Sequence, residues 1–503
     1  MHLLPLACAA LAALSSSASA ASEEHFRELA TTDFILVSAA GEQRTRDIAA
    51  KAAMFRAAME AVFGLRVTLA TPTRIYALSA EDWERYVQPR PNVAGYFAAH
   101  PFGSDLLFDA DADDPRRFEL MFHEYTHYVL RTLTSGRYPA FFDEGLAEVF
   151  STATFSDGVV SFEPRPEYVA YLRRREWMPF ERLLEIERRD AEYVDHTLAP
   201  AFYAQAWATM YYAVAADSAF GNRLLDYIRN LNSGVARDEA VEALIGDTIA
   251  HANREIARFV LSRRPPLPAA EIRVGGIADE RSFVQRRLNH AESSLILAEL
   301  MLRLGNRSEA ALTLLRDVRG DENTLVRARI NEGLAHLQAG DRERALGVLN
   351  GVPASAALPA VAAVALGRGL FELSVHPDRG AQELSEAQRR RLRRARALFA
   401  TALHDPRGWI EATNGYVLAS LALHQHEESL VELASKAYGA APKSAELAVS
   451  LAILHDLQGR KPVARRYWRE AARNLHEGPS RSRILAELAP DEVDSRQAPL
   501  SQN

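Results

Sequence analysis

Two histidines and a glutamate stand at spacings that suit metal chemistry, in the run His123-Glu124-Tyr125-Thr126-His127. Residues four apart in an α-helix lie one above the other on the same face, so both imidazoles can bind one cation. Glu124 is turned by about 100° from its neighbour around the helix axis. It can therefore approach a water molecule on that cation without binding the cation itself. The spacing predicts a metal site with a carboxylate base beside it.

A third candidate ligand follows in the chain. A helix is predicted after Pro139, and it carries the run Phe141-Phe142-Asp143-Glu144-Gly145-Leu146-Ala147-Glu148. The segment between His127 and Glu144 is long enough for one loop and a returning helix. Two imidazoles, one carboxylate and an open fourth position form the ligand set of a catalytic zinc site. The sequence therefore predicts that His123, His127 and Glu144 bind Zn²⁺.

Residues 115 to about 215 resemble a gluzincin-type zinc peptidase, the clan of thermolysin and the aminopeptidase N relatives. The resemblance lies in the two runs quoted above, the second of which is similar to the third-ligand helix of that clan. It implies that His123, His127 and Glu144 are zinc ligands, that Glu124 is the general base, and that the reaction is peptide-bond hydrolysis.

The resemblance implies a supporting role for Glu148, one helical turn past Glu144. Glu148 matches the thermolysin-type carboxylate that hydrogen-bonds the first histidine, here His123, and thereby orients the imidazole. Two alternatives stay open at this point. Glu148 could instead be the third ligand, or a surface carboxylate.

Farther along the chain, Phe202-Tyr203-Ala204-Gln205-Ala206-Trp207 resembles the tyrosine-bearing helix of the aminopeptidase branch. The resemblance implies that the Tyr203 phenol stabilises the oxyanion. Tyr211 and Tyr212, on the same predicted helix, compete for that role.

The sequence departs from the aminopeptidases of this clan in one respect. They recognise a free amino terminus through a Gly-x-Met-Glu-Asn type strand, and the nearest run here is Ala58-Met59-Glu60-Ala61. That run lacks the asparagine and lies in a predicted amphipathic helix, far upstream of His123. Endopeptidase activity is therefore favoured over aminopeptidase activity.

Strands and helices alternate ahead of the histidines. Four strands are predicted, at 34–37, 74–78, 95–97 and 106–108, with a helix around 48–63 and an N-cap at Ser79. From Pro115 onward the patterns are almost entirely helical. The predicted fold is an α+β metallopeptidase domain, with a small mixed sheet and active-site helices, over residues 21–264. The strand 106–108 is predicted to be an edge strand that pairs with an extended substrate.

The second half of the chain is predicted to be all-α. A Pro- and Gly-rich linker is expected at 265–280, helical repeats at 281–480 and a disordered tail at 481–503. Gly305 and Gly340 stand in similar turns about one 34-residue repeat apart, and Gly459 lies in a third such turn. These turns resemble those of a degenerate tetratricopeptide array of three to five helix pairs. A plain helical bundle stays open as the alternative.

The bulk composition limits the cellular setting and the partners. Residues 1–20 have the form of a signal peptide that ends at Ala18-Ser19-Ala20, and the only cysteine, Cys8, lies within it. The expected mature chain has neither disulfides nor thiolate ligands, which is typical of a periplasmic or secreted bacterial protein. The net charge of −7 gives no sign of nucleic-acid binding, and no membrane span is expected.

The leading hypothesis is an exported zinc peptidase that acts on a peptide or protein substrate, with a possible protein partner on the helical repeats. One alternative is a helical-repeat scaffold with a vestigial zinc domain. A zinc hydrolase that cleaves another bond is a further alternative, because such a metal site activates water against several electrophiles.

Overall fold

We describe the protein from a computed structural model of the 503-residue chain. The structure describes residues 26–31, 34–63, 73–87, 95–100, 103–111, 114–130, 138–156, 158–233, 235, 237–245, 249–262, 267, 269–274, 283–305, 307–354, 356–375, 383–405, 408–474, 484 and 488. The predicted signal peptide lies outside these residues.

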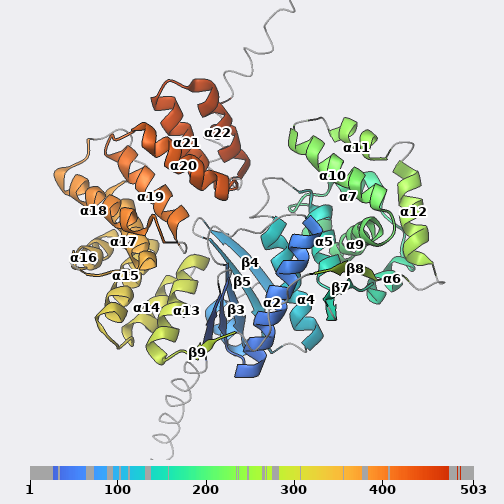
Figure 1. Ribbon diagram of the computed structural model, residues 1–503, viewed down its shortest axis with the longest axis horizontal. Coiled ribbons are helices and arrows are strands. Elements are labelled where there is room, and N and C mark those ends of the chain that lie inside the picture. The colour runs from blue at the N-terminus through green and yellow to red at the C-terminus, as the bar shows by residue number, and fades with distance from the viewer. Residues whose placement is uncertain are drawn as a thin grey trace, which may run out of the picture.

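A six-stranded mixed sheet lies at the centre of the molecule (Figure 1), with the strand order β4-β5-β3-β2-β1-β9. The inner strands β2, β3 and β5 are parallel, and the other three run antiparallel to their neighbours. The strands are β1 (Arg27–Ala30), β2 (Phe34–Ser38), β3 (Thr73–Leu78), β4 (Gly95–His100), β5 (Gly103–Asp109) and β9 (Gln285–Arg287). The four predicted strands are therefore confirmed.

The predicted position of the edge strand is wrong. Residues 106–108 belong to β5, which pairs with β3 on one side and with β4 on the other. Leu106, Leu107 and Phe108 are fully buried, as a continuous apolar run in an inner strand should be. The edge strand on this side is β4, in which Gly95 pairs with Phe108, and the opposite edge strand is β9.

The inner strands are buried on both faces, because successive side chains point to opposite sides. In β3, Ile75 and Ala77 join a core with two helices of the first half, α2 (Glu42–Phe63) and α4 (Asp114–Tyr128). Tyr76 and Leu78 join a separate core with the helices of the second half. The sheet is thus the shared wall between the two halves.

A short helix follows β3. Ser79 accepts a hydrogen bond from the backbone N–H of Asp82, which confirms the predicted N-cap of α3 (Ala80–Asp82). The chain continues as a π-helical turn, η2 (Trp83–Val87), in which Trp83 is buried against the second half.

A second lobe beyond α4 is mostly helical and holds a three-stranded sheet with the order β6-β7-β8. The strands are β6 (Ala153–Ser156), β7 (Val159–Phe162) and β8 (Ala270–Arg273). The helices are α5 (Ala140–Phe150), α6 (Pro166–Leu172), α7 (Phe180–Glu185), α8 (Ala191–Val194), α9 (Ala199–Ala215), α10 (Ser218–Ser233), α11 (Arg237–Ile245) and α12 (Ile249–Leu261). Part of the segment expected to be a linker therefore forms β8.

Within the described residues, five antiparallel helix pairs follow β9 and form an arc beside the sheet (Figure 1). They are α13 (His290–Leu304) with α14 (Ser308–Arg316), α15 (Glu322–Gln338) with α16 (Arg342–Asn350), α17 (Ala360–Ser374) with α18 (Glu386–Ala402), α19 (Trp409–Ala422) with α20 (Glu428–Ala440), and α21 (Ala445–Leu457) with α22 (Lys461–Asn474). The predicted turn glycines Gly305, Gly340 and Gly459 adopt left-handed φ angles of 84°, 83° and 74°. Glycine adopts this conformation without the steric cost of a Cβ.

Both ends of this helical array are attached to the first half. Its start is tied through β9, which pairs with β1. Near its far end, Lys443 donates a hydrogen bond of 3.0 Å to the backbone oxygen of Leu130, two residues beyond the end of α4. Of the expected tail, Ile484 and Leu488 are described, and they pack against Ala448 and Trp468.

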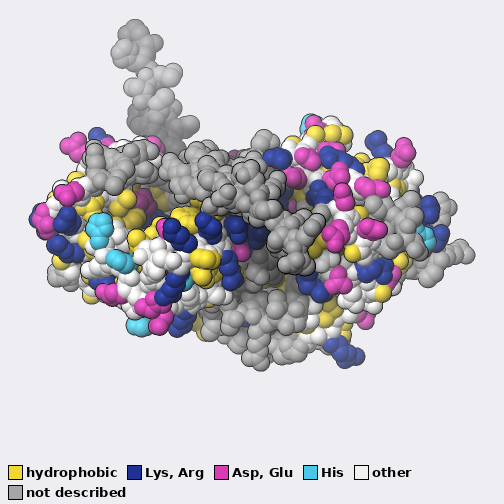
Figure 2. All heavy atoms as spheres, turned by 90° about the horizontal axis from the view of Figure 1, so that it is seen from above, with side chains coloured by type: hydrophobic (Ala, Val, Ile, Leu, Met, Phe, Trp, Pro, Cys, Tyr) yellow, Lys and Arg dark blue, Asp and Glu magenta, His cyan; other side chains and the backbone are white. Residues whose placement is uncertain are grey.

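The described surface carries charges of both signs. Figure 2 shows acidic and basic side chains interspersed over the described parts of one face, with a group of basic side chains over the C-terminal half. Among the described residues, no helix combines the length and the apolar character that crossing a membrane requires.

Candidate metal centre

Aromatic packing sets the rotation of α4 about its own axis. Phe122 of α4 stacks on Phe55 of α2 with ring centroids 4.4 Å apart, and Tyr125 meets the same ring edge-on at 5.6 Å. All three side chains are almost completely buried. With this face of α4 against α2, His123 and His127 lie on the face directed toward α5.

The next helix, α5, is buried along its whole length. At Gly145 it crosses α9 so closely that a Cβ would lie 2.6 Å from the backbone oxygen of Ala206 and 2.6 Å from Cγ of Met210. Real Cβ contacts are longer than this, so the crossing depends on glycine. The crossing holds Glu144, the preceding residue, at a fixed depth opposite the two histidines.

Three predicted ligands meet at one point. The Nε2 atoms of His123 and His127 are 3.1 Å apart. Oε2 of Glu144 lies 3.6 Å from the first of these nitrogens and 3.3 Å from the second. Ligand atoms about 2.0–2.1 Å from a tetrahedral zinc ion are separated by roughly 3.4 Å, so these distances suit such an ion. The group His123, His127 and Glu144 can hold a metal ion.

His127 is oriented by a residue that the sequence analysis missed. Its Nδ1 lies 2.9 Å from Oδ1 of Asp143, a fully buried carboxylate that also accepts a hydrogen bond from Arg188. A proton on Nδ1 satisfies this hydrogen bond and leaves the lone pair of Nε2 directed toward Glu144. Asp143 thus fixes the orientation and the tautomer that a metal ligand needs.

His123 has a carboxylate behind it as well. Oε1 of Glu148 lies 3.6 Å from Nδ1 of His123, which is an ion-pair distance but longer than a hydrogen bond. Arg165 forms an ion pair with this carboxylate, with 3.0 Å between Nε of Arg165 and Oε2 of Glu148. Glu148 therefore lies at the nitrogen that faces away from the ligand group. Of the three roles considered for Glu148, orientation of His123 agrees best with this geometry.

Two tyrosines lie beside Glu144. The Tyr193 hydroxyl, on α8, donates a hydrogen bond of 2.7 Å to Oε1 of Glu144. The ring of Tyr203, on α9, has its centroid 6.0 Å from that of Tyr193. Burial, and next the Glu144 carboxylate, raise the pKa of Tyr203 well above its usual value. The Tyr203 phenol therefore keeps its proton at neutral pH and can donate a hydrogen bond.

The competing tyrosines of α9 have partners elsewhere. Tyr211 is fully buried, and its hydroxyl donates to the backbone oxygen of Phe162 at 3.4 Å. The Tyr212 hydroxyl donates to Asp217 at 3.3 Å. Both hydroxyls bond to residues outside the ligand group, so Tyr203 is the best placed of the three.

Glu124 lies against the edge strand. A Cβ added to Gly95, the first residue of β4, would be 3.2 Å from Cγ of Glu124 and 3.4 Å from its Oε1 atom. The glycine allows the candidate base to lie close to the backbone of β4. Gly95 is a second residue of the site that the motif did not indicate.

Carboxylates dominate the charge around the histidines. Burial lowers the pKa of His127, but Glu144 and Asp143 outweigh it and raise the pKa to about 10. Burial likewise raises the pKa of Glu144, yet the two histidines outweigh it and lower the pKa well below its usual value. A site that favours a proton on His127 so strongly also favours a metal cation.

The sequence predicted the residues of the metal group but only part of their surroundings. The structure brings Glu124, Glu148 and Tyr203 to the vicinity of His123, His127 and Glu144. It adds Asp143, Tyr193, Arg188, Arg165 and Gly95. Asp143 had a signal, since it is a second carboxylate next to Glu144, whereas Arg188 and Tyr193 reach the site only through the fold.

A scan against profiles of known protein families finds no match for this chain, and a search of curated proteins also finds none.

Proposed function

We propose that the protein is a zinc-dependent peptidase, with a gluzincin-like catalytic domain and a tetratricopeptide-like helical array. The observation that carries the proposal is the meeting of two imidazole nitrogens and one carboxylate oxygen within 3.6 Å, beside a glutamate that is not part of the group. This is the donor set of a catalytic zinc site, because a structural site would close its fourth position with another side chain. Residues described by the structure supply no fourth ligand to this group.

Each residue then has a chemical task. Zinc, when bound, supplies a Lewis acid that lowers the pKa of a water molecule to about 7 and polarises the substrate carbonyl. Glu124 accepts the proton of the attacking water and returns it to the leaving amine. Tyr203 donates a hydrogen bond to the oxyanion, and Tyr193 is the second phenol within reach of that role.

The substrate is expected to bind in an extended form along β4. This strand lies at the edge of the central sheet, and its first residue contacts Glu124. An edge strand presents unpaired backbone N–H and C=O groups, with which a peptide can pair. A substrate paired in this way passes the candidate base, which favours endopeptidase cleavage of an unfolded polypeptide outside the cytoplasm.

The test compares the wild type with Glu124→Gln, each expressed from residue 21 onward. We expect one zinc ion per chain in both by elemental analysis, because Glu124 is not a ligand. Cleavage of an unfolded protein should fall by about 10²–10⁴-fold in the variant. A chelator should abolish cleavage by the wild type, and added zinc should restore it.

The matched control is Glu81→Gln, at a glutamate that is 71% exposed and pairs with Arg85 in the first half of the chain. It should retain full activity. A wild type that holds no zinc would refute the ligand assignment. A zinc-loaded wild type that cleaves no unfolded protein would refute the peptidase and favour the scaffold hypothesis.

A further inference from the structure

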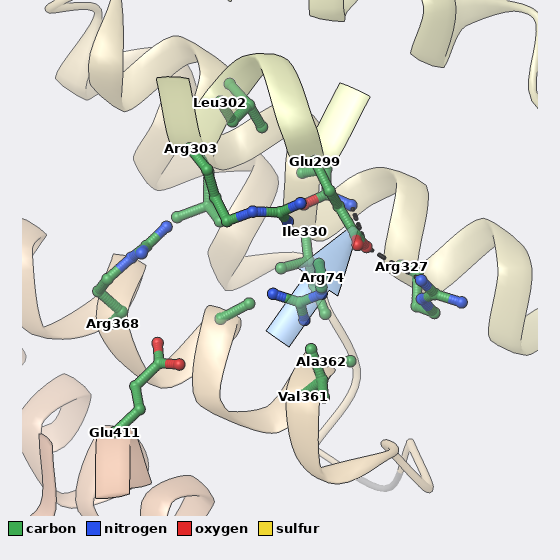
Figure 3. A pocket seen from close by; sticks show the side chains of 13 residues that line it. Arg74, Glu299, Leu302, Arg303, Arg327, Ile330, Val361, Ala362, Arg368 and Glu411 are labelled. Carbon is green, nitrogen blue, oxygen red and sulfur yellow. Dashed lines mark hydrogen bonds and ion pairs between the residues drawn. The ribbon is translucent and has the colours of Figure 1, made fainter. Parts of the chain in front are cut away.

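A second concave site lies on the other face of the central sheet, away from α4. It is a pocket of about 70 Å³, partly open to solvent, between β3 and the helices α13, α15, α17 and α19 (Figure 3). These are the first helices of four consecutive pairs in the helical array. The pocket therefore exists only because the array folds back onto the sheet.

Four arginines line the pocket. Arg74 comes from β3, Arg303 from α13, Arg327 from α15 and Arg368 from α17. The acidic lining residues are Glu299 and Glu411. Four guanidinium groups from four different elements thus line one small pocket. Their charges are available to a ligand only where no neighbouring carboxylate neutralises them.

Two of the arginines have strong partners. Arg327 donates to Glu299 at 3.0 Å, and that carboxylate also accepts from Asn331 at 3.2 Å. Arg303 donates to Asp105, a fully buried residue of β5, at 2.6 Å. These pairs neutralise Arg327 and Arg303 and hold the wall of the pocket rigid.

The other two arginines differ in their partners. Arg74 makes no hydrogen bond or ion pair with any residue that the structure describes, although it lies in register with Asp105 on the neighbouring strand. Arg368 forms an ion pair of 3.8 Å with Glu372, which is itself half-exposed. Both side chains are partly exposed to the pocket. Arg74 therefore leaves an excess of positive charge there.

Glu411 does not cancel that excess at neutral pH. Burial raises the pKa of its carboxyl group to about 8, and this effect outweighs Arg368, Arg74 and Arg303, the charged groups around it. Figure 3 shows the Glu411 side chain pointing into the pocket from α19. A protonated carboxyl group in this position can donate a hydrogen bond to an anion.

Apart from Asn331, the remaining lining is aliphatic. Ile330 and Leu334 of α15 are buried in the wall, whereas Val361 of α17 is 37% exposed at the pocket. Val361 is one of few large apolar side chains this exposed among the described residues. A ligand that covered it would gain free energy by removing apolar surface from water.

We propose that this pocket binds a ligand with one carboxylate on a short aliphatic body, such as the carboxy-terminal residue of a peptide. The carboxylate lies between Arg74 and Arg368 and accepts a hydrogen bond from Glu411, and the aliphatic body covers Val361. A guanidinium group matches the fork of a carboxylate with two parallel hydrogen bonds. A doubly charged phosphate is less suited, because Glu299 is an ionised carboxylate in the same pocket.

Isothermal titration calorimetry with the full mature chain tests this site without reference to the metal centre. The probes are an acetylated pentapeptide that ends in leucine with a free carboxylate, the same peptide as its carboxamide, N-acetylleucine and inorganic phosphate. The carboxamide should bind at least about tenfold more weakly than the acid, because it lacks the charge that the arginines bind. Tighter binding of the peptide than of N-acetylleucine would identify a polypeptide end as the source, and equal binding would identify a free small acid.

Two variants connect the binding to the pocket. Arg74→Gln and Arg368→Gln should each weaken binding of the acid by about tenfold or more. Arg344→Gln, at an arginine of α16 that is 73% exposed, is the matched control and should bind like the wild type. Circular dichroism confirms that each variant is folded. Binding that is absent, that is equal for the carboxamide, that prefers phosphate, or that survives both pocket variants would overturn the proposal.

Discussion

The two faces of the central sheet meet their helices through different chemistry. On one face, α2 and α4 pack through aromatic and aliphatic side chains, with Phe55 stacked on Phe122. On the other face, apolar contacts from Tyr76 and Leu107 are interrupted by a charged layer around Arg303 and Asp105. The first face supports a site that must hold ligand atoms within tenths of an ångström. The second joins two halves that are far apart in the sequence.

The two faces should therefore be sensitive to different kinds of substitution. A dry, closely packed contact depends on the volume of each side chain, since interiors are packed like crystals. A buried ion pair depends on both partners being present, because one charge left alone in the interior is costly. The same kind of small substitution should therefore act through different causes on the two faces.

The largest effect is expected from Asp105→Asn, on the charged face. Asp105 is fully buried and accepts from Arg303, whose Nη2 also donates to the Tyr76 hydroxyl at 2.5 Å. Asparagine keeps the shape but leaves the Arg303 charge uncompensated. We expect a loss of about 3–5 kcal/mol in the free energy of unfolding, measured by urea denaturation.

A second ion pair near the same junction provides the control. Arg286 of β9 lies 3.0 Å from Glu28 of β1, and its side chain is 51% exposed. Glu28→Gln should cost less than about 1 kcal/mol, because solvent screens an exposed pair. Equal losses in the two variants would mean that burial does not distinguish these pairs and would contradict the comparison.

In the apolar core that α5 and α9 share with α2 and α4, Gly145→Ala tests the crossing of α5 and α9. The added methyl group would meet Ala206 and Met210 at 2.6 Å, so the two helices must separate. We expect a loss of about 1–3 kcal/mol, together with weaker zinc binding, because Glu144 moves with α5. Thermal unfolding with and without zinc measures both effects.

Gly347→Ala is the matched control, since Gly347 lies in α16 with no atom within 4 Å of an added Cβ. Alanine should leave stability unchanged or raise it by about 0.5–1 kcal/mol, because glycine is the poorer helix former. Loss of stability in both variants would show that glycine itself, rather than the close crossing, is what matters at these positions.

The site residues that could be predicted lie close together in the sequence, and those that were missed lie far apart in it. His123, His127 and Glu144 could be named because helix periodicity fixes two of them and a short returning helix supplies the third. Arg188 could not be named, because it reaches Asp143 only after α6 and α7 have folded around α9. Arg74 and Glu411 line the same pocket for a similar reason, because no local sequence pattern encodes the packing of the helical array on the sheet.

The features of the fold that could be predicted from the sequence are likewise the local ones. The apolar runs at 34–37 and 74–78 indicated buried strands, and Gly305 and Gly340 indicated turns between helices, because each signal is local. The edge of the sheet was placed wrongly because strand order depends on pairing partners rather than on the strand itself. Nothing in the sequence analysis indicated that the helical array covers one face of the sheet.

The smallest expected effect concerns Glu411, at the pocket between the two halves. Its pKa of about 8 lies above the ordinary value of 4.5, since burial outweighs the attraction of Arg368, Arg74 and Arg303. A raised carboxyl pKa means that the folded state binds the proton more tightly than the unfolded state does. The resulting stability is fully present below about pH 4.5 and is lost as the pH rises through about 8.

Glu411→Gln removes this titration while keeping an uncharged side chain of the same size. The wild type should therefore lose more stability than the variant as the pH rises, by less than about 1 kcal/mol between pH 6 and 7, because the carboxyl group is partly exposed. Unfolding midpoints measured from about pH 5 to 9 give the two slopes, with Glu427→Gln as a control at an exposed glutamate of the same array. Parallel slopes for the wild type and Glu411→Gln would mean that the charged layer accommodates an ionised Glu411, and the contrast between the two faces of the sheet would then rest on the Arg303 and Asp105 pair alone.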